Sequence, residues 1–311
     1  MQPFVVAMVA GAALEQAAPK MRAVVSDVDG TLFSFAGRRI SPGNAAALSE
    51  CVEAGVHVCL ATGRLPGPWY DDIRAELPGL GPCVFGNGAL VLDEQDSVLY
   101  EAQLPRDVVH RVLQLTSGGM LSGGGRLSVL AATRYAGEEA SYGGLRYCEL
   151  APTGPTHITS LIAGAGEPDA VVLPSLDGFE DRQVIKFVIW TTPGEDGWAD
   201  MPSTVEALRV ALAGTGVTLL DHGAKWCEVL PAGVNKGAGV ARVLDRLGVP
   251  AADMLALGDA ENDVEMLAMA GVGAAVANAQ PAAIEAADVT VGSNAEDGVA
   301  QAVRRYVWGD A

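Results

Sequence analysis

Short apolar runs alternate with amphipathic stretches at both ends of the chain. The apolar runs have the length of strands, and the stretches between them carry apolar residues at helical spacing. Strands are predicted at 22–27, 56–62, 83–85, 254–257 and 272–276, and helices at 42–54, 69–77, 234–247, 262–269 and 281–286. Strands that alternate with helices join through right-handed crossovers, which place them in a parallel sheet with helices on both faces. This pattern predicts an α/β fold whose core is a Rossmann-like, doubly wound parallel sheet.

The middle of the chain has a different composition. Residues 117–125 are rich in glycine, and residues 152–168 contain repeated Pro and Gly. Strand-like runs at 184–190 and 217–220 precede another at 225–230, with which they can pair. This composition and strand pattern predict an inserted α+β domain. The chain is then expected to leave the first sheet and later return to it. The expected organisation is an extension at 1–20, a discontinuous core domain at 21–90 and 232–311, and an inserted domain at 91–231.

The first 20 residues contain one short apolar run, from Phe4 to Leu14, which Gly11 interrupts. A bilayer span needs about 20 apolar residues, so this run is too short to cross a membrane. No Lys or Arg precedes the run and Glu15 follows it closely, which is unlike a secretory signal. We therefore expect an unstructured extension that ends before Met21, and a targeting segment is the alternative.

The charge of the chain excludes several kinds of partner. Lys and Arg number 20 against 38 Asp and Glu, so the net charge is −18. Contacts with the phosphates of nucleic acids or of anionic membranes need positive groups, and the sequence has no basic run. We therefore expect no nucleic acid and no membrane as partner, and either a monomer or a homodimer.

The spacing of cysteine and histidine adds no disulfide or metal motif. The cysteines are odd in number, none forms a CxxC pair, and the four histidines form no motif. Reduced thiols in a protein core are the expected state, which indicates a cytoplasmic protein. An organelle or export is the alternative if residues 1–20 are a targeting segment. The positions are Cys51, Cys59, Cys83, Cys148, Cys227, His57, His110, His157 and His222.

The strongest chemical signal follows the first predicted strand, where Asp27 and Asp29 flank Val28 and precede Gly30. Residues i and i+2 of an extended chain point to the same side, about 6.6 Å apart along the strand. Both carboxylates can therefore face one reacting centre, and Gly30 permits a tight exit turn. The alternative is a simple turn, but two repelling charges at a partly buried point bring no structural benefit.

Two further motifs suit a phosphate. Thr62, Gly63 and Arg64 end the second long strand and offer a hydroxyl, backbone N–H groups and a guanidinium. Lys236 stands at a helix start, where the helix dipole is already positive, so an anion is its expected partner. The alternatives are a helix-capping turn with a solvated arginine, and an exposed lysine.

The last motif suits a metal ion. Asp259 ends another apolar strand, and Asp263 follows at a helix start. Carboxylate oxygens are the ligands that Mg²⁺ prefers, whereas helix capping by Asn262 or Asp263 explains only one of the acids. The carboxyl ends of parallel strands share one edge of a sheet, so all four motifs are expected to meet there. Together they predict Mg²⁺-assisted phosphoryl transfer with a carboxylate nucleophile.

The order of these motifs resembles the haloacid dehalogenase (HAD) superfamily of phosphotransferases. The matching pieces are DVDGT at 27–31, TGR at 62–64, Lys236 and GDAEND at 258–263, and the resemblance runs from about residue 21 to 300. More narrowly the chain resembles the Cof-type subfamily, whose class-two (IIB) cap is inserted between the second and third motifs. Further matching stretches are 87–89, 228–237, 277–279 and 296–300. The resemblance implies a HAD-like core and a cap that selects the substrate.

The resemblance also implies a role for each site residue. Asp27 would be the nucleophile, and Asp29 the acid that protonates the leaving oxygen and then the base that activates water. Crowding by other carboxylates and partial burial are expected to keep Asp29 protonated at first. Phosphate contacts would come from Thr62, the Gly63 amide, Arg64, Lys236 and Asn262. Mg²⁺ would bind Asp27, the backbone carbonyl of Asp29, and Asp259, with Asp263 in support directly, through water or through Lys236.

The predicted function is that of a Mg²⁺-dependent phosphatase that hydrolyses small phosphorylated metabolites through an aspartyl-phosphate. Sugar phosphates, nucleotides and phosphorylated cofactors are the expected substrate classes. A phosphomutase with the same nucleophile is one alternative, and a noncatalytic sensor of phosphate ligands is another. Trp69 and Tyr70, which follow Arg64 closely, are interpreted as packing residues.

Overall fold

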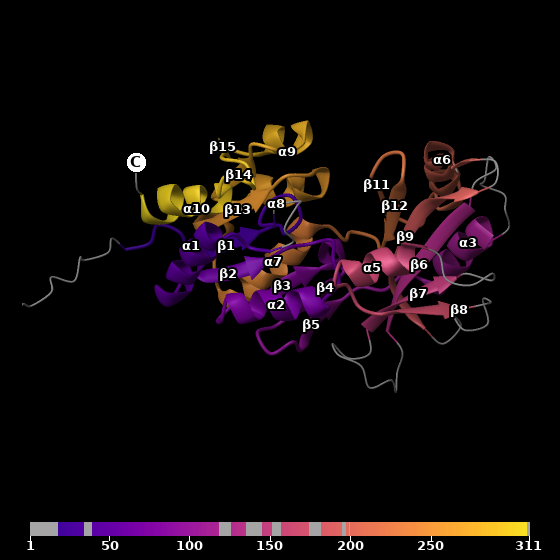
Figure 1. The fold of residues 1–311 in the computed structure, drawn as a ribbon, viewed down its shortest axis with the longest axis horizontal. Helices are drawn as coiled ribbons and strands as arrows, with labels where there is room; N and C mark the ends of the chain where they lie inside the picture. The colour runs from indigo at the N-terminus through magenta and orange to yellow at the C-terminus, as the bar shows by residue number, and fades with distance from the viewer. Residues whose placement is uncertain are drawn as a thin grey trace, which may run out of the picture.

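The structure is a computed structural model that describes residues 18–33, 39–117, 126–134, 145–150, 157–173, 182–194, 197–198 and 200–309. Over these residues the chain forms a core unit and an inserted unit, which lie side by side along the long axis of the molecule (Figure 1). Most of the predicted extension at 1–20 and of the glycine-rich segment at 117–125 lies outside the described residues. None of the described helices is long and apolar enough to cross a membrane.

A five-stranded parallel sheet forms the centre of the core unit within the described residues, in the order β15-β14-β13-β1-β2. The strands are β1 (Ala23–Ser26), β2 (His57–Leu60), β13 (Met254–Gly258), β14 (Val272–Val276) and β15 (Val289–Val291). In β1, Val24 lies opposite Leu255 of β13 and Val58 of β2. Every side chain of β1 and β13 is buried. The predicted α/β fold with a doubly wound parallel sheet is confirmed.

Alternate residues of these strands face opposite layers of helices. Val24 and Leu255 pack with α1, α2 and α10, whereas Val25 and Ala256 pack with α7, α8 and α9. Both faces are covered, which explains the continuous apolar runs in the sequence. The helices are α1 (Pro42–Glu53), α2 (Pro68–Glu76), α7 (Lys236–Leu247), α8 (Val264–Met269), α9 (Pro281–Ala286) and α10 (Gly298–Ala302). The chain then continues into a π-helical turn, η5 (Val303–Trp308).

Local signals place the start of α7 at the site. The Asn235 side chain accepts a hydrogen bond from the Ala238 N–H at 2.7 Å, so Lys236 becomes the first residue of the helix. Gly248, with φ of 62°, ends the same helix in the left-handed conformation. The helix predicted at 262–269 begins instead with a 3-10 turn, η4 (Glu261–Asp263), before α8. A second short 3-10 turn, η3 (Ala251–Asp253), precedes β13.

A short antiparallel sheet lies beside the core sheet. It contains β3 (Cys83–Phe85), β4 (Leu90–Leu92) and β5 (Val98–Glu101), with a 3-10 turn, η1 (Gly86–Gly88), between the first two strands. The boundary expected at residue 91 therefore falls inside β4. The 93–97 segment forms the turn of the β4–β5 hairpin, and the hairpin keeps residues 91–101 on the core unit.

The inserted unit is built on a mixed sheet with the order β11-β12-β9-β6-β7-β8 among the described residues. The strands are β6 (Arg126–Arg134), β7 (Leu145–Leu150), β8 (Ala170–Leu173), β9 (Gln183–Gly194), β11 (Thr218–Asp221) and β12 (Trp226–Leu230), and β10 (Gly197–Trp198) pairs with β9. The helices are α3 (Arg106–Ser117), α5 (His157–Gly164) and α6 (Met201–Ala211). The strands predicted at 184–190, 217–220 and 225–230 are confirmed.

The two faces of this sheet have different neighbours. Val129, Phe187 and Val229 pack with α3 and α6 in a core of their own. Leu130 and Val188, on the opposite face, pack with α5 and belong to the same apolar cluster as the core unit. The second face of the inserted sheet is therefore the one that meets the site.

Gly88 provides a test of how η1 is held against α7. Its φ is 99°, and a Cβ atom there would lie 2.1 Å from the Asn235 carbonyl oxygen. Gly88→Ala is expected to lower the free energy of unfolding by about 3 kcal/mol or more, because backbone would have to move. Gly55 is the matched control, since its φ is 79° and a Cβ atom would meet open space. Gly55→Ala is expected to cost only about 1–2 kcal/mol in urea denaturation, and equal costs for the two variants would contradict the contact.

Candidate active site

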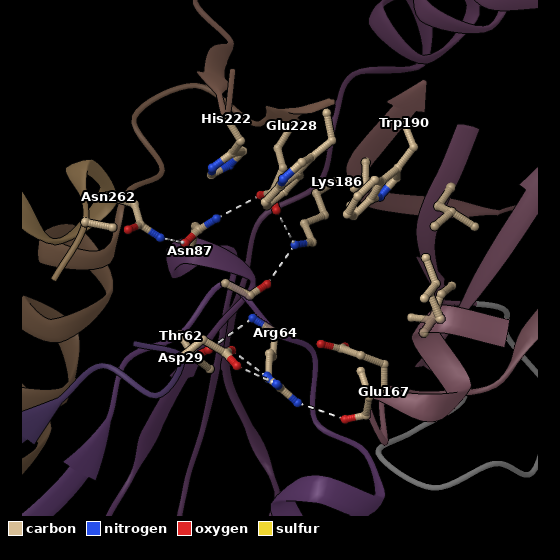
Figure 2. A pocket seen from close by; sticks show the side chains of 18 of the residues that line it. Asp29, Thr62, Arg64, Asn87, Glu167, Lys186, Trp190, His222, Glu228 and Asn262 are labelled. Carbon is tan, nitrogen blue, oxygen red and sulfur yellow. Dashed lines mark hydrogen bonds and ion pairs between the residues drawn. The ribbon is translucent and has the colours of Figure 1, made fainter. Parts of the chain in front are cut away.

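The ends of three parallel strands and the start of α7 converge at one edge of the core sheet. Asp27 follows β1, Thr62 follows β2, Asp259 follows β13, and Lys236 begins α7. A cavity of about 570 Å³ lies between this edge and the inserted unit (Figure 2). Among the predicted site residues, those that line it are Asp27, Asp29, Thr62, Gly63, Arg64, Asp259 and Asn262. Lys236 and Asp263 are not part of the lining and lie against Asp27 and Asp259 instead.

Lys236 joins two buried carboxylates. Its Nζ atom donates to Asp27 Oδ1 and to Asp263 Oδ1, both at 2.6 Å, and all three side chains are buried. The other Asp263 oxygen accepts the backbone N–H groups of Asp259 and Ala260, both at 3.0 Å. The anion expected next to Lys236 is therefore a pair of carboxylates, and Asp263 links α7 to the end of β13.

Burial and mutual repulsion disfavour the charged acids of this cluster. Burial raises the pKa of Asp27 well above its usual range, Lys236 opposes the shift, and Asp263 and Asp259 add to it. Burial also raises the pKa of Asp259 to about 6, and Asp263 adds to that shift. Burial alone lowers the pKa of Lys236, but Asp263 and Asp27 outweigh it, so that its pKa is raised and its ammonium stays charged.

The donor set fits a hard divalent cation. Carboxylate oxygens of Asp27, Asp259 and Asp263 lie within 4.8 Å of one another, and among the described residues the ammonium that pairs with this cluster is that of Lys236. Asp27 Oδ2 is buried and has no hydrogen-bond partner within the part of the chain that the structure describes. Gly30, with φ of 89°, brings the loop close to Asp259: a Cβ atom would lie 2.3 Å from Asp259 Oδ2. These are oxygen ligands of the kind that Mg²⁺ takes.

Asp29 was expected to be partly buried and crowded by other carboxylates. The structure shows that this expectation is wrong. Its side chain is 49% exposed, and both of its oxygens accept hydrogen bonds from the Arg64 guanidinium at 2.5 Å. Arg64 also donates to the Ala165 carbonyl oxygen of the inserted unit at 2.8 Å, and its guanidinium lies over the rings of Phe33 and Trp69. Asp29 points away from the acidic cluster because the turn after Val28 turns it toward the loop that follows β2.

The loop at 62–64, which was predicted to bind phosphate, contacts both the core unit and the inserted unit. Thr62 Oγ1 accepts the Arg64 N–H at 3.1 Å, and the Gly63 carbonyl accepts from Lys186 of β9 at 2.7 Å. Lys186 in turn pairs with Glu228 of β12 at 3.1 Å, and both side chains are buried. Sequence reasoning missed this ion pair, although a lysine inside the otherwise apolar strand at 184–190 was a signal for it.

Two more polar groups complete the cavity. The Asn87 amide donates to Glu228 at 2.8 Å and accepts from the Asn262 amide at 2.9 Å, which places Asn262 beside the cap rather than alone at the phosphate end. Glu167, also missed from the sequence, accepts the Leu65 N–H at 3.0 Å. Burial raises the pKa of Glu167 to about 7, although Lys186 and Arg64 oppose the shift.

Comparison with known proteins identifies the family. Residues 24–119 and 176–303 match the family described as haloacid dehalogenase-like hydrolase. The chain belongs to this family. It is a Cof-type member, as its motif order and inserted cap indicated.

Relatives of this haloacid dehalogenase-like chain come from several kingdoms. It is 31% identical over 300 residues to a protein named "Endoribonuclease YBEY, chloroplastic" from Arabidopsis thaliana, with 93% of this chain and 47% of that protein covered. The chain thus spans about half the length of that relative. It is 27% identical to "5-amino-6-(5-phospho-D-ribitylamino)uracil phosphatase YitU" from Bacillus subtilis (strain 168), with 91% and 96% covered.

Solved haloacid dehalogenase-like structures share the whole architecture. A hydrolase of this kind from Bacteroides thetaiotaomicron superimposes with a TM-score of 0.73 at 25% identity, with 92% of this chain and 99% of that chain covered. A putative HAD/COF-like hydrolase from Plasmodium vivax gives 0.76 at 21% identity, with 92% and 95% covered, which shows the same fold.

Several residues of this family member are structural, as expected. Trp69 and Tyr70 are buried, and the Trp69 Nε1–H donates to the Leu65 carbonyl at 2.7 Å. All five cysteines are free and buried. Trp69 and Tyr70 belong to the apolar cluster of the core unit, and the Arg64 guanidinium lies over the Trp69 ring.

The acidic cluster predicts how the metal-free protein responds to pH. The pKa of Asp259 is raised to about 6, so the folded state binds a proton that the unfolded state has lost, and wild-type stability falls as pH rises from about 4 to 6. Asp259→Asn is expected to reduce this slope, to which Asp27 and Glu167 also contribute, and to stabilise the metal-free protein at pH 7 by about 1–3 kcal/mol. Exposed Asp245 of α7 supplies the control, and Asp245→Asn is expected to change little. Chemical denaturation with EDTA at several pH values measures both, and a destabilised Asp259→Asn protein would contradict the repulsion.

Proposed function

We propose that this chain is a Mg²⁺-dependent phosphatase that hydrolyses small phosphorylated metabolites through an aspartyl-phosphate on Asp27. The proposal rests on the hydrogen bonding of the two Asp27 carboxylate oxygens. One of its oxygens is held by Lys236, and the other is buried without a hydrogen bond in the described chain, at the lining of the cavity. The family, and the phosphatase name of the Bacillus subtilis relative, support the same class of reaction.

Asp27 is the proposed nucleophile. Lys236 fixes Oδ1, so Oδ2 is the oxygen left to form the bond to phosphorus while the bond to the leaving oxygen breaks. Attack of a carboxylate on a phosphate anion requires positive groups around both. Thr62 and the Gly63 amide supply donors at the same edge of the sheet, and Lys236 offsets the charge of Asp27 itself.

The proposed metal site consists of Asp27, the backbone carbonyl of Asp29 and Asp259. Asp263 supports it through Lys236 and through the backbone of Asp259, because its two oxygens already accept hydrogen bonds from these groups. When bound, Mg²⁺ supplies charge neutralisation between the nucleophile and the phosphoryl oxygens. The cluster of buried acids with a single ammonium has the charge that such a cation balances.

Asp29 has the proposed role of acid and then base. In this structure both of its oxygens are occupied by Arg64, so Asp29 donates a proton to a leaving oxygen only after the guanidinium moves. Arg64 is also bound to Ala165 of the inserted unit, which couples that movement to the position of the cap. After the leaving group departs, Asp29 takes a proton from the water that attacks the aspartyl-phosphate.

The dimensions of the cavity support a small substrate. A volume of about 570 Å³ lies within the range of pockets that enclose metabolites and cofactors. The cavity is lined from both units, with Asp29 and Thr62 on the core side and Lys186, Trp190 and Glu228 on the side of the inserted unit (Figure 2).

Removal of the nucleophile is the direct test. Asp27→Asn keeps the shape of the side chain but removes its charge, so phosphate release is expected to fall by at least about 10³-fold. A screen of phosphorylated metabolites with Mg²⁺ measures released phosphate, with Asp245→Asn as the control for an exposed acid. An unchanged rate in Asp27→Asn would contradict the nucleophile, and isomerised product without phosphate release would identify a mutase.

Metal dependence can be read from stability as well as from activity. Mg²⁺ at 100 times its dissociation constant is expected to raise the free energy of unfolding by about 2.7 kcal/mol. Phosphate release is expected to stop in EDTA and to return with Mg²⁺. In Asp259→Asn both responses are expected to be lost, whereas Asp253→Asn, which changes a partly exposed acid paired with Arg22, keeps them. An equal thermal shift in Asp259→Asn and wild type would place the ion elsewhere.

A further inference from the structure

A closed ring of four hydrogen bonds anchors the loop that follows β2. The Asn87 N–H donates to the Thr62 carbonyl at 2.9 Å, and the Asn87 side-chain amide donates to Glu228 Oε2 at 2.8 Å. Lys186 Nζ donates to Glu228 Oε1 at 3.1 Å and to the Gly63 carbonyl at 2.7 Å, which returns the ring to the loop (Figure 2). The ring therefore holds two consecutive carbonyl groups of this loop.

The ring crosses the boundary between the two units. Asn87 belongs to η1 of the core unit, whereas Lys186 and Glu228 lie on β9 and β12 of the inserted unit. Glu228 lies opposite Val188 in the sheet, so Lys186 is its diagonal neighbour on the same face. This is the face of the inserted sheet that meets the site. The ring can therefore close only while that face lies against the core unit.

The members of the ring are costly to keep in place. Asn87, Lys186 and Glu228 are 1%, 2% and 3% exposed. Asn87 has a φ of 56°, a left-handed conformation that residues other than glycine rarely adopt, and it stands between Gly86 and Gly88, which also have positive φ. A buried ion pair is a poor source of stability, and uncommon backbone conformations concentrate at functional sites. These costs indicate a role for the ring other than stability.

The ring fixes the direction of one backbone donor. In a trans peptide group the N–H points opposite to the C=O, so the bond from Asn87 to the Thr62 carbonyl also sets the direction of the Gly63 N–H. Lys186 fixes the next peptide group through the Gly63 carbonyl. The Gly63 N–H makes no hydrogen bond within the described part of the chain, and Gly63 is a partly exposed residue of the cavity lining. This donor is therefore available to an anion in the cavity.

Gly63 needs anchors on both sides because a glycine backbone is unusually free to rotate. A Cβ atom at this position would lie 3.1 Å from Asn87 Oδ1, so a side chain that restricts the backbone would crowd the ring. Asn87 Oδ1 also accepts a hydrogen bond from the Asn262 amide at 2.9 Å. The ring thus holds two of the predicted phosphate contacts, the Gly63 N–H and Asn262.

We propose that Lys186 and Glu228 are positioning residues that orient the Gly63 N–H toward the phosphoryl group. Lys186 acts through the Gly63 carbonyl, and Glu228 acts through Lys186 and Asn87. Because both positioning residues belong to the inserted unit, the phosphate site is complete only while that unit is docked on the core. The inference rests on the proposed phosphatase function and adds two residues of the inserted unit to its phosphate site.

A double variant without net change of charge tests the ring. Lys186→Met alone leaves the Glu228 carboxylate buried without its cation and is expected to destabilise the protein. Lys186→Met/Glu228→Met removes both charges, so its urea midpoint is expected to stay near that of the wild type. With Mg²⁺, its dissociation constant for inorganic phosphate is expected to rise about 10-fold or more in calorimetric titration, because a hydrogen bond to a charged group is weakened. An unchanged dissociation constant would overturn the inference.

A second ion pair between the units provides the matched control. Arg134 of β6 pairs with Glu101 of β5 at 2.7 Å, their side chains are 16% and 11% exposed, and neither residue lines the cavity. Arg134→Met/Glu101→Met is expected to leave the dissociation constant for phosphate unchanged. A loss of the same size in this control would overturn the inference, because general contact between the units would then set the affinity.

The amide proton of Gly63 tests the donor in the wild-type protein, even if the double variant does not fold. Isotope-labelled protein with Mg²⁺ is titrated with inorganic phosphate, and the backbone amide signals are followed by NMR. The Gly63 proton signal is expected to move downfield as its N–H donates to phosphate. Phosphate binding without this shift would overturn the inference.

Hydrolysis of p-nitrophenyl phosphate separates the inference from the proposed function. In Lys186→Met/Glu228→Met, kcat/KM is expected to fall by at least about 10-fold, because a misdirected donor stabilises the transition state less. Full retention of wild-type hydrolysis in this variant would overturn the positioning role alone. Phosphate binding that depends on the ring, with no phosphate release from any ester by the wild type, would overturn the phosphatase and leave the positioning role standing. Absence of phosphate binding by the wild type would overturn both.

Discussion

The ammonium of Lys236 between Asp27 and Asp263 is the interaction on which the rest of the site depends. It joins the start of α7 to the ends of β1 and β13, three segments that are far apart in the sequence. Desolvation of a buried ion pair can cost as much as the attraction returns, so such a cluster is a poor source of stability. The ion pair instead fixes the orientation of Asp27. Lys236 holds one carboxylate oxygen, and the other has no hydrogen-bond partner among the described residues.

A second set of contacts joins the phosphate loop to the inserted unit. Within three consecutive residues, Gly63 accepts from Lys186, Arg64 donates to Ala165, and Leu65 donates to Glu167. The loop that carries the predicted phosphate donors is thus held in place by the cap as well as by β2. On the proposed function, a movement of the inserted unit would change all three contacts together and would separate Arg64 from its carbonyl partner. In this structure Arg64 is paired with Asp29, which lies in the same cavity.

The sequence was sufficient to predict the core sheet and the convergence of the motif residues at one of its edges. Parallel strands end on one edge, so motifs that follow strands had to converge, and the structure brings Asp27, Thr62 and Asp259 to one cavity. Contacts across the inserted sheet could not be predicted in the same way. Lys186 and Glu228 are 42 residues apart, and their pairing depends on the antiparallel register of β9 and β12.

Two other expectations failed for local reasons. The spacing of Asp27 and Asp29 assumed an extended chain, but β1 ends at Ser26 and a turn separates the two carboxylates. The start of the insert at residue 91 followed a change in composition, whereas hairpin pairing keeps β4 and β5 on the core. Side-chain direction in a turn and antiparallel pairing both depend on contacts that periodicity does not report.

The charge balance of the cavity sets the order of binding. Six carboxylates, those of Asp27, Asp29, Glu167, Glu228, Asp259 and Asp263, surround three cations, those of Arg64, Lys186 and Lys236. Each cation is already paired, so the site remains negative, like the whole chain with its charge of −18. A phosphate anion is repelled by such a site until a divalent cation is bound next to Asp27 and Asp259. On the proposed function, metal binding is therefore expected to precede substrate binding, because the cation offsets the carboxylates that would otherwise repel the phosphate.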